Sequence, residues 1–199
     1  MLTPPYKNSK ISLMIEDVRL ELKKQLYELL DKNALSRGKV VLSSGKESNY
    51  YLDGRLVTLS AKGAYLAARI ILDLVRGEKI DAIGGPTLGA DPLVGAIAAL
   101  SYLDKRPIST FIVRKVPKQH GKMRQIEGPL IGKSKRVILI DDVATTGKAL
   151  VEAKQALDNE GIKADKAIVI VDREEGAAES LREHGLRLIS IFKARDFGV

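Results

Sequence analysis

The residues with the clearest chemical potential are two adjacent carboxylates, Asp141 and Asp142, which follow an apolar run and precede a Thr-Thr-Gly-Lys turn. The run, residues 137–140, is mostly β-branched and predicts a buried strand. The turn, residues 145–148, predicts a helix N-terminus, whose free backbone N–H groups and positive dipole end suit a phosphate. Carboxylates accept hydrogen bonds from sugar hydroxyls. Together these features predict a site for a phosphorylated ribose.

A basic segment lies before this strand and contains Arg114, Lys115, Lys118 and His120 within seven residues. A basic loop is most often a solvated surface. Cations held ready around a reacting group can also stabilise the negative charge that develops there. Displacement of pyrophosphate from a sugar carbon would create such charge, so this loop is a candidate for catalysis beside the phosphoribose site.

Arg173 follows Asp172 at the end of another apolar run and precedes two glutamates. Considered alone, it is equally well explained as a surface arginine paired with these acids. Its rigid guanidinium is also the side chain best suited to hold a carboxylate by two parallel hydrogen bonds. On the residues alone, both interpretations stay open.

Alternating apolar patterns predict the elements that must position these groups. Helices are predicted at residues 11–33, 61–75, 91 onward, 145–160 (opened by the Thr-Thr-Gly-Lys turn) and 176–184, with Ser60 and Asp91 as N-caps. Strands are predicted at residues 80–84, 108–113, 137–141, 167–171 and 186–192, with a polar connection at 114–128. This alternation predicts an α/β fold with a mainly parallel, twisted sheet flanked by helices. Two further short strands, 39–42 and 50–53, are expected to lie apart from that pattern.

Polar segments follow several of the predicted strands, at the point where each strand ends. They are residues 86–89, 114–115, 141–148 and 172–173. In open α/β sheets, ligands bind in the crevice beyond the carboxyl ends of the strands. We therefore expect these segments to form one composite site.

The composition limits the classes of protein that need to be considered. The chain has a net charge of +8, and the whole excess lies in residues 103–136, where ten Lys or Arg stand against two acidic residues. This concentration favours a local anion site over a general nucleic-acid surface. The absence of cysteine excludes disulfides and cysteine-based metal sites. With no long apolar run and no signal-peptide core, the sequence predicts a cytoplasmic protein that does not bind membranes.

The stretch Ile-Leu-Ile-Asp-Asp-Val-Ala-Thr-Thr-Gly, residues 138–147, resembles the phosphoribosyl pyrophosphate (PRPP) signature of the type I phosphoribosyltransferases. The resemblance implies the fold of that family, with a small N-terminal hood that covers the base. It also implies that the two acids bind ribose hydroxyls and that the turn cradles the 5-phosphate. The PRPP-binding residues implied in this stretch are Asp141, Asp142, Val143, Ala144, Thr145, Thr146, Gly147, Lys148 and Ala149.

The basic pattern Arg-Lys-x-x-Lys-x-His-Gly, residues 114–121, resembles the mobile catalytic loop of the orotate phosphoribosyltransferases within that family. The resemblance implies that this loop contacts PRPP and its leaving pyrophosphate in the active site of a neighbouring subunit, and hence that the protein is a homodimer. The implied catalytic and PRPP-binding residues are Arg114, Lys115, Lys118 and His120. By the same resemblance, Arg173 and Thr145 bind orotate.

Two positions depart from the pattern of the family. Ser43 stands in the hood where many members have Lys or Arg, and Gly89 stands where some relatives place a lysine in the pyrophosphate loop. Backbone N–H groups near Gly89 could replace that lysine, because a glycine lets a backbone approach a ligand closely.

The implied reaction transfers the ribose 5-phosphate of PRPP to orotate, giving orotidine 5′-monophosphate and pyrophosphate, in de novo pyrimidine (UMP) biosynthesis. Mg²⁺ is the implied cofactor, held mainly by PRPP oxygens and with no direct protein ligand. Residues 1–58 are expected to form an N-terminal helix and hood, and residues 59–199 the PRPP-binding core, within a single compact domain. One alternative is a PRPP-binding regulator of the same fold, whose basic segment would bind nucleic acid. Another is a purine or uracil phosphoribosyltransferase, but a purine has no carboxylate for Arg173 to hold.

Overall fold

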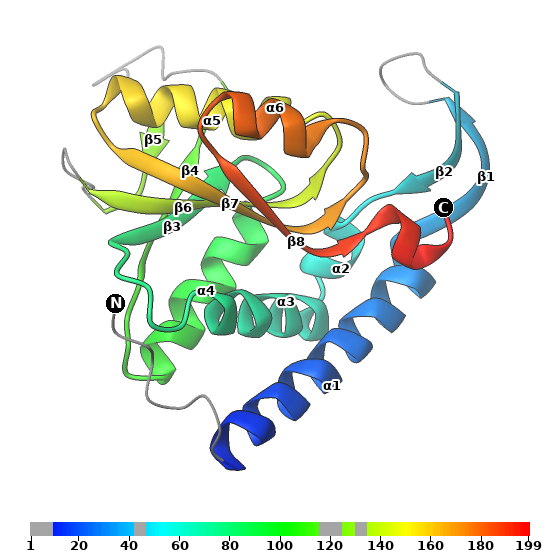
Figure 1. The fold of residues 1–199 in the computed structure, drawn as a ribbon, viewed down its shortest axis with the longest axis horizontal. Coiled ribbons are helices and arrows are strands. Elements are labelled where there is room, and N and C mark those ends of the chain that lie inside the picture. Colours follow the sequence, from blue (N-terminus) through cyan, green and yellow to red (C-terminus); the bar gives the residue numbers. More distant parts are fainter. Residues whose placement is uncertain (1–9, 42–46, 116–124, 130–134) are drawn as a thin grey trace.

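A six-stranded sheet forms the centre of the protein (Figure 1). The computed structural model describes residues 10–41, 47–115, 125–129 and 135–199. The strands lie in the order β5-β4-β3-β6-β7-β8, and all neighbours are parallel except the antiparallel pair β4 and β5. Their bounds are β3 Ala82–Pro86, β4 Ser109–Val113, β5 Ile126–Glu127, β6 Arg136–Ala144, β7 Lys163–Asp172 and β8 Arg187–Lys193. The predicted mainly parallel α/β sheet is thus confirmed.

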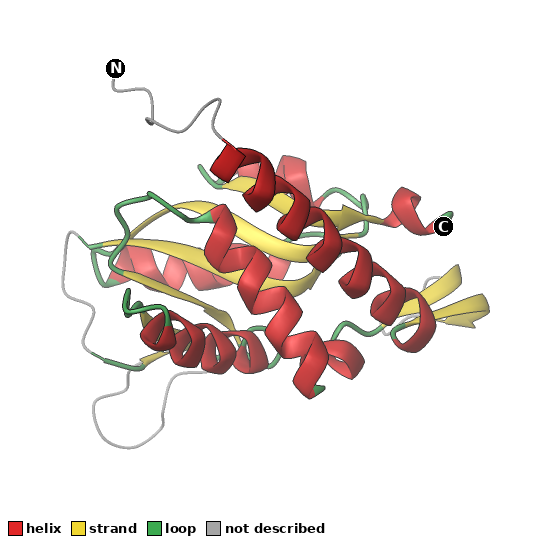
Figure 2. Ribbon diagram, turned by 90° about the horizontal axis from the view of Figure 1, so that it is seen from below, coloured by secondary structure: helices red, strands yellow, loops and turns green. Residues whose placement is uncertain are grey.

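Helices cover both faces of the sheet. Their bounds are α1 Lys10–Asn33, α2 Arg55–Thr58, α3 Ala61–Leu74, α4 Asp91–Leu103, α5 Lys148–Asn159 and α6 Ala177–Glu183, followed by the 3₁₀ turn η1 Ala194–Phe197. Helices α5 and α6 lie on one face and α1, α3 and α4 on the other (Figure 1). Figure 2 views the molecule from the side of the second group, whose helices lie across the strands. This arrangement leaves the ends of the strands open for a site.

The central strand β6 shows why the sheet needs helices on both faces. Ile138 and Ile140 belong to the core cluster with α1, α3 and α4, whereas Val137 and Leu139 belong to the cluster with α5 and α6. All four are buried. Successive side chains of a strand point to opposite faces, so a continuous apolar run serves two cores at once.

A two-stranded antiparallel sheet, β1 Leu35–Val41 with β2 Glu47–Leu52, projects from the body beside the C-terminus (Figure 1). We call this pair of strands the hood. Arg37 of the hood donates a hydrogen bond to the carbonyl oxygen of Phe197 (3.0 Å), and the ring of Tyr27 stacks on that of Phe197 at 4.7 Å. The C-terminal turn therefore ties the hood to α1. Ser43, between the two strands in the sequence, lies outside the described residues.

The structure corrects several predicted boundaries. Strand β6 continues through both acids to Ala144, because residues 141–144 pair with β7. Strand β3 begins and ends two residues later than predicted, because Pro86 still pairs with Val113 of β4. Ser60 caps α3 as predicted, its side chain accepting a hydrogen bond from Gly63 N. The helix predicted to start at Asp91 is confirmed as α4, but its predicted N-cap was wrong: Asp91 lies in the first turn, and the N-cap is Ala90.

Candidate active site

The two carboxylates of β6 lie buried at the carboxyl end of the sheet. Asp141 is 7% exposed and Asp142 8%. Asp141 Oδ1 accepts a hydrogen bond from Asp142 N (3.0 Å), and Asp142 Oδ1 accepts one from Val143 N (2.8 Å). Burial raises the pKa of Asp141 well above its ordinary value, and the charge of Asp142 raises it further. Burial likewise raises the pKa of Asp142. Buried carboxyl groups with a raised pKa are most often found at functional sites.

The connection between β3 and α4 passes directly over these acids. A Cβ atom at Gly89 would lie 2.0 Å from Asp141 Oδ1 and 2.4 Å from Asp142 Oδ1. No side chain fits there without movement of the loop or the acids, so the backbone itself is the neighbour of the carboxylates. This close approach of the loop to the two acids requires glycine at position 89.

Asp91 adds a third acid to this region, which the sequence interpretation assigned only to a helix cap. Its Oδ1 atom is buried and has no hydrogen-bond partner in the described part of the chain. Burial raises the pKa of Asp91, and the charge of Asp91 contributes to the raised pKa of Asp141. The first turn of α4 therefore forms part of the same electrostatic environment.

The Thr-Thr-Gly-Lys turn connects β6 to α5, as predicted. Gly147 has φ +79° and immediately precedes the first helical residue, Lys148. In this left-handed conformation glycine is preferred, and the turn sends the chain sharply from strand to helix. Thr146 and Lys148 are exposed, as is Ala149. Since the first N–H groups of a helix have no intrahelical partner, this exposed turn can receive an anion.

Arg173 lies at the end of β7 with its side chain only 5% exposed. Its backbone N–H donates to the carbonyl oxygen of Ala144 (2.9 Å), which places it beside the phosphate turn. Its Nε donates to the hydroxyl of Tyr50 (3.2 Å), and its guanidinium carbon lies 4.5 Å from the centre of the Tyr50 ring. The hood thus contributes directly to the position of this arginine, a contact that no local sequence pattern indicates.

Arg173 also retains an unused donor. Its Nη2 lies 2.8 Å from Glu175 Oε1, at ion-pair distance. The angle is not that of a hydrogen bond, and this buried nitrogen has no hydrogen-bond acceptor among the described residues. The Glu175 carboxylate therefore balances the charge of Arg173, while the hydrogen-bonding position of Nη2 stays unmet. The arrangement favours the carboxylate-binding interpretation of Arg173 over a plain surface ion pair.

The backbone next to Arg173 is held in an unusual conformation. Glu174 has φ +58°, a region that residues other than glycine rarely adopt. Its N–H donates to Asp172 Oδ1 (2.9 Å), and its side chain pairs with Arg195 of the C-terminal turn (2.6 Å). These contacts fix the loop that carries Arg173, and sparsely populated conformations of this kind are concentrated at functional sites.

The basic segment begins at the same edge of the sheet, after β4. Arg114 N donates to the carbonyl oxygen of Gln125 (2.9 Å), and its guanidinium lies 3.4 Å from a Glu127 oxygen. Lys115 is exposed. Lys118 and His120 lie outside the described residues, so their catalytic role stays a prediction.

Asp53 and Arg55 border the site from the segment that follows the hood, and sequence reasoning assigned neither a role. They form a double hydrogen bond, with Nε–Oδ1 2.8 Å and Nη2–Oδ2 2.9 Å. The charge of Asp53 raises the pKa of Asp142, whereas the charge of Arg55 lowers it. This pair therefore adjusts the field at the carboxylates of β6.

The donor set limits how a metal ion could be held. Among the described residues no group of three or more His, Cys, Asp or Glu side chains could hold a metal ion. The acids at or beside the site include Asp141, Asp142, Asp91 and the arginine-paired Asp53. Mg²⁺ commonly keeps several waters and binds through one or two carboxylates plus substrate phosphates. The site fits an ion that arrives with a phosphorylated ligand better than a permanent metal centre.

The fold and the site define a phosphoribosyltransferase. A sequence model of the phosphoribosyl transferase domain matches residues 57–191. The match covers β3 to β7, including both acids, the phosphate turn and Arg173. The chain therefore belongs to the phosphoribosyltransferase family.

Within that family, its relatives are orotate phosphoribosyltransferases. The orotate phosphoribosyltransferase of Aquifex aeolicus is 41% identical over 183 residues, covering 91% of this chain and 97% of the relative. That of Rhodopseudomonas palustris (strain TIE-1) is 39% identical over 87% of this chain and 94% of its own length. The crystal structure of Mycobacterium tuberculosis orotate phosphoribosyltransferase in complex with PRPP has a TM-score of 0.74 and 33% identity, covering 89% of this chain and 99% of its own.

One further finding concerns membranes. Across the residues that the structure describes, no helix combines the length and the apolar character needed to span a bilayer.

Proposed function

We propose that this protein catalyses the transfer of ribose 5-phosphate from PRPP to orotate, giving orotidine 5′-monophosphate and pyrophosphate, in pyrimidine nucleotide synthesis. The observation that carries the choice of orotate is the buried guanidinium of Arg173, whose Nη2 has no hydrogen-bond acceptor among the described residues. It lies next to the phosphate turn through its contact with Ala144. A carboxylate on the base would supply the missing acceptor, and the orotate phosphoribosyltransferase relatives support this choice.

In the proposed reaction, a ring nitrogen of orotate forms a bond to the anomeric carbon while the bond from that carbon to the pyrophosphate oxygen breaks. The electron pair leaves with pyrophosphate, and the sugar passes through a cation-like state. Asp141 and Asp142 hold the ribose hydroxyls and favour that positive charge. Residues 143–149 of the turn hold the 5-phosphate, and Thr145 joins Arg173 at the base.

We assign the departing pyrophosphate to the basic segment. Arg114, Lys115, Lys118 and His120 are proposed to neutralise its charge and to exclude water, which prevents hydrolysis of PRPP. Mg²⁺ is proposed to arrive with PRPP and to neutralise its phosphate oxygens. No covalent nucleophile is needed. The cysteine-free composition supports a cytoplasmic location for this chemistry.

The decisive experiment measures loss of orotate absorbance in the ultraviolet with PRPP and Mg²⁺, using adenine, hypoxanthine and uracil as control bases. Of the four bases, we expect only orotate to be turned over. Removal of Mg²⁺ by a chelator should abolish this turnover. Arg173→Ala should raise the KM for orotate and leave the KM for PRPP largely unchanged. Turnover of a base without a carboxylate would contradict the assignment. So would an equal rise in the KM values for orotate and PRPP in Arg173→Ala.

The proposed homodimer, with the basic segment shared between subunits, has its own test. Lys118→Ala alone should lower turnover about 100- to 1,000-fold, because removing one group that stabilises developing negative charge typically costs roughly 2.7–4 kcal/mol. Asp141→Asn alone should also be inactive. Mixing the two variants should restore part of the activity if each loop serves its neighbour. No recovery after verified subunit exchange would show that each loop acts within its own chain.

A further inference from the structure

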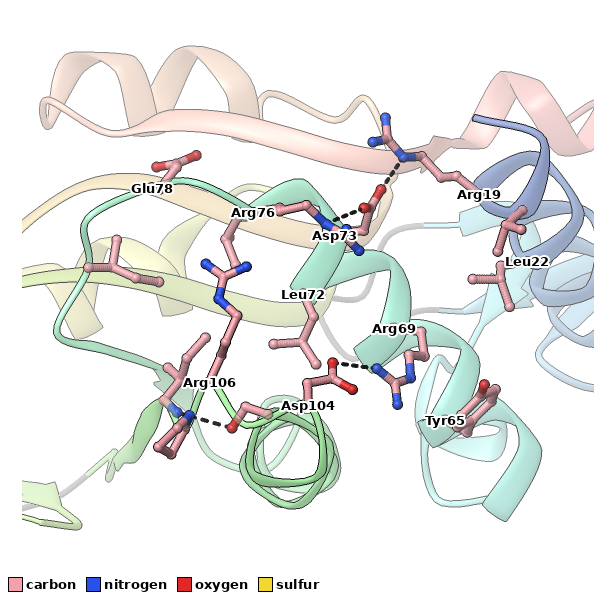
Figure 3. Close-up of a pocket in the computed structure, with 16 residues that line it drawn as sticks. Arg19, Leu22, Tyr65, Arg69, Leu72, Asp73, Arg76, Glu78, Asp104 and Arg106 are labelled. Carbon is pink, nitrogen blue, oxygen red and sulfur yellow. Dashed lines mark hydrogen bonds and ion pairs between the residues drawn. The ribbon is translucent and has the colours of Figure 1, made fainter. Parts of the chain in front are cut away.

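A pocket lies on the opposite side of the molecule from the acids of β6. It has a volume of about 820 Å³ and is enclosed by α1, α3, the end of α4 and the residues that lead into β3 and β4 (Figure 3). In a parallel sheet this is the amino-terminal edge of the strands, whereas the proposed substrate site lies at their carboxyl ends. The proposed reaction makes no use of this pocket.

The floor and walls of the pocket are largely apolar. The apolar lining comes from different elements and consists of Val18, Leu22, Leu72, Val75, Ile80, Pro107 and Ile108. Tyr65 of α3 adds an aromatic ring that is 46% exposed. Pockets of this size with an apolar lining and a few polar groups are typical of small-molecule sites.

Cationic groups surround this apolar lining. Asp73 pairs with Arg19 and with Arg76 (3.1 Å), and Asp104 pairs with Arg69 (2.5 Å). Figure 3 shows the two groups on opposite sides of Leu72. Arginine can hold an anion by two parallel hydrogen bonds and stack on an aromatic face, so these groups are suited to more than internal pairing.

The arginines exceed the acids available to neutralise them. The remaining acid of the lining, Glu78, forms its ion pair with the buried Lys166 outside the lining. Arg106 also lines the pocket, and within the described part of the chain it has no carboxylate at ion-pair distance. Its charge is close enough to contribute to the lowered pKa of Asp104, whose main cause is the hydrogen bond from Arg69. The lining therefore has four arginines and only two acids, Asp73 and Asp104, that do not pair with a group outside it. This leaves an excess of two positive charges.

We propose that this pocket binds a phosphomonoester that carries a flat, apolar or aromatic body. A phosphomonoester near neutral pH carries close to two negative charges, which matches the excess of the arginines. Arg106 and Arg69 hold the phosphate group, and the flat body lies on the apolar lining beside Tyr65. The Tyr65 ring already lies 5.7 Å from the Arg69 guanidinium carbon. Nucleoside monophosphates and simple aryl phosphates share this chemistry.

The test uses the full chain and the fluorescent probe 1-naphthyl phosphate, titrated in the presence of PRPP and Mg²⁺ without orotate. We expect one probe molecule to bind per chain. Arg106→Ala and Arg69→Ala should each weaken probe binding at least tenfold while leaving the KM values for orotate and PRPP unchanged. The matched control is Arg182→Ala, which removes an exposed, ion-paired arginine from α6 on the other face and should not alter binding.

Separate titrations define the chemistry of the ligand. Inorganic phosphate and 1-naphthol should each bind much more weakly than the probe, because each offers only half of the recognised groups. AMP, CMP, GMP and UMP then distinguish a nucleotide from an aryl phosphate as the source of the ligand. Undiminished binding to Arg106→Ala would overturn the proposal, as would equal binding of inorganic phosphate. Absence of any probe binding, as expected if a second copy covers the pocket, would also overturn it.

Discussion

Arg173 and Glu175 form an ion pair that is incomplete: Nη2 and Oε1 lie 2.8 Å apart, yet the nitrogen has no hydrogen-bond acceptor among the described residues. Glu175 is 37% exposed at its side chain, whereas that of Arg173 is 5% exposed. Glu175 therefore supplies negative charge to the arginine without meeting the geometric requirement of a carboxylate held by a guanidinium fork. An incoming orotate carboxylate would provide both the negative charge and the hydrogen-bond geometry.

This relationship predicts that Glu175 competes weakly with the substrate. Glu175→Gln keeps the size of the side chain and removes its charge, so orotate should meet a more available guanidinium. We expect the KM for orotate to fall about two- to fivefold, in keeping with roughly 1 kcal/mol or less for a partly exposed ion pair. The KM for PRPP should not change. Steady-state kinetics of Glu175→Gln and the wild type measure both KM values. A rise in the KM for orotate would mean that Glu175 assists binding.

Tyr50 is expected to act on the same arginine from the hood. Its hydroxyl accepts a hydrogen bond from Arg173 Nε at 3.2 Å, and its ring lies against the guanidinium. Tyr50→Phe keeps the ring and removes the acceptor. A hydrogen bond to a charged group is worth about 1.5–3 kcal/mol, so the KM for orotate should rise about tenfold or more. Tyr102→Phe, at an exposed position on α4, is the control and should behave like the wild type.

Gly89 should tolerate no side chain. Gly89→Ala places a methyl group 2.0 Å from an oxygen of Asp141, so the loop or the acid must move. Misplacement of a reacting group by about 1 Å can cost roughly 100-fold in rate, and we expect a loss of turnover of that order. Gly95→Ala is the matched control, because nothing lies within 4 Å of its added Cβ. In the middle of α4 this change should stabilise the protein by about 0.5–1 kcal/mol. Comparable activity of the two variants would contradict the close packing inferred at Gly89.

The parts of the fold and site that local sequence patterns determine were predictable. The strand that carries Asp141, the turn at Gly147 and the position of Arg173 all follow from short runs of apolar residues and the residues that end them. The contact of Tyr50 with Arg173 was not predictable in this way. A close approach of the backbone was predicted at Gly89, but its contact with Asp141 and Asp142 was not. Tyr50 reaches Arg173 across 123 positions of sequence, and that contact depends on how the hood packs against the sheet.

The errors in element boundaries have a related cause. An isolated pattern does not show how far a strand continues when a neighbour is present to pair with it. Strand β6 extends through two carboxylates because β7 offers backbone partners beyond Asp141. The two-residue strand β5 exists only by pairing with β4, and its own sequence is too short to carry a period. Tertiary pairing, which is nonlocal, decides both cases.

The burial of Asp141 predicts that the site is maintained at a cost in stability. The pKa of this carboxyl is higher in the folded protein than in the unfolded chain, chiefly because burial disfavours its charged form. Between these two pKa values the folded state binds more protons, so the free energy of unfolding falls as the pH rises. Above both values the penalty is complete and constant. The penalty comes from the charge of Asp141. Asparagine has nearly the same shape but carries no charge.

Asp141→Asn should therefore abolish turnover and raise thermal stability at neutral pH. The free energy of unfolding should rise, because the substitution removes the charge that burial disfavours. Denaturation measured from pH 8 downward should show the gain shrinking as the pH falls through the raised pKa of Asp141 and disappearing below the ordinary pKa of a carboxyl, where Asp141 is neutral in both states. Asp165→Asn removes an exposed acid from a surface ion pair and should have little effect. A variant less stable than the wild type at neutral pH would show that the charge of Asp141 is compensated within the folded chain. A gain independent of pH would show that the gain does not come from that charge.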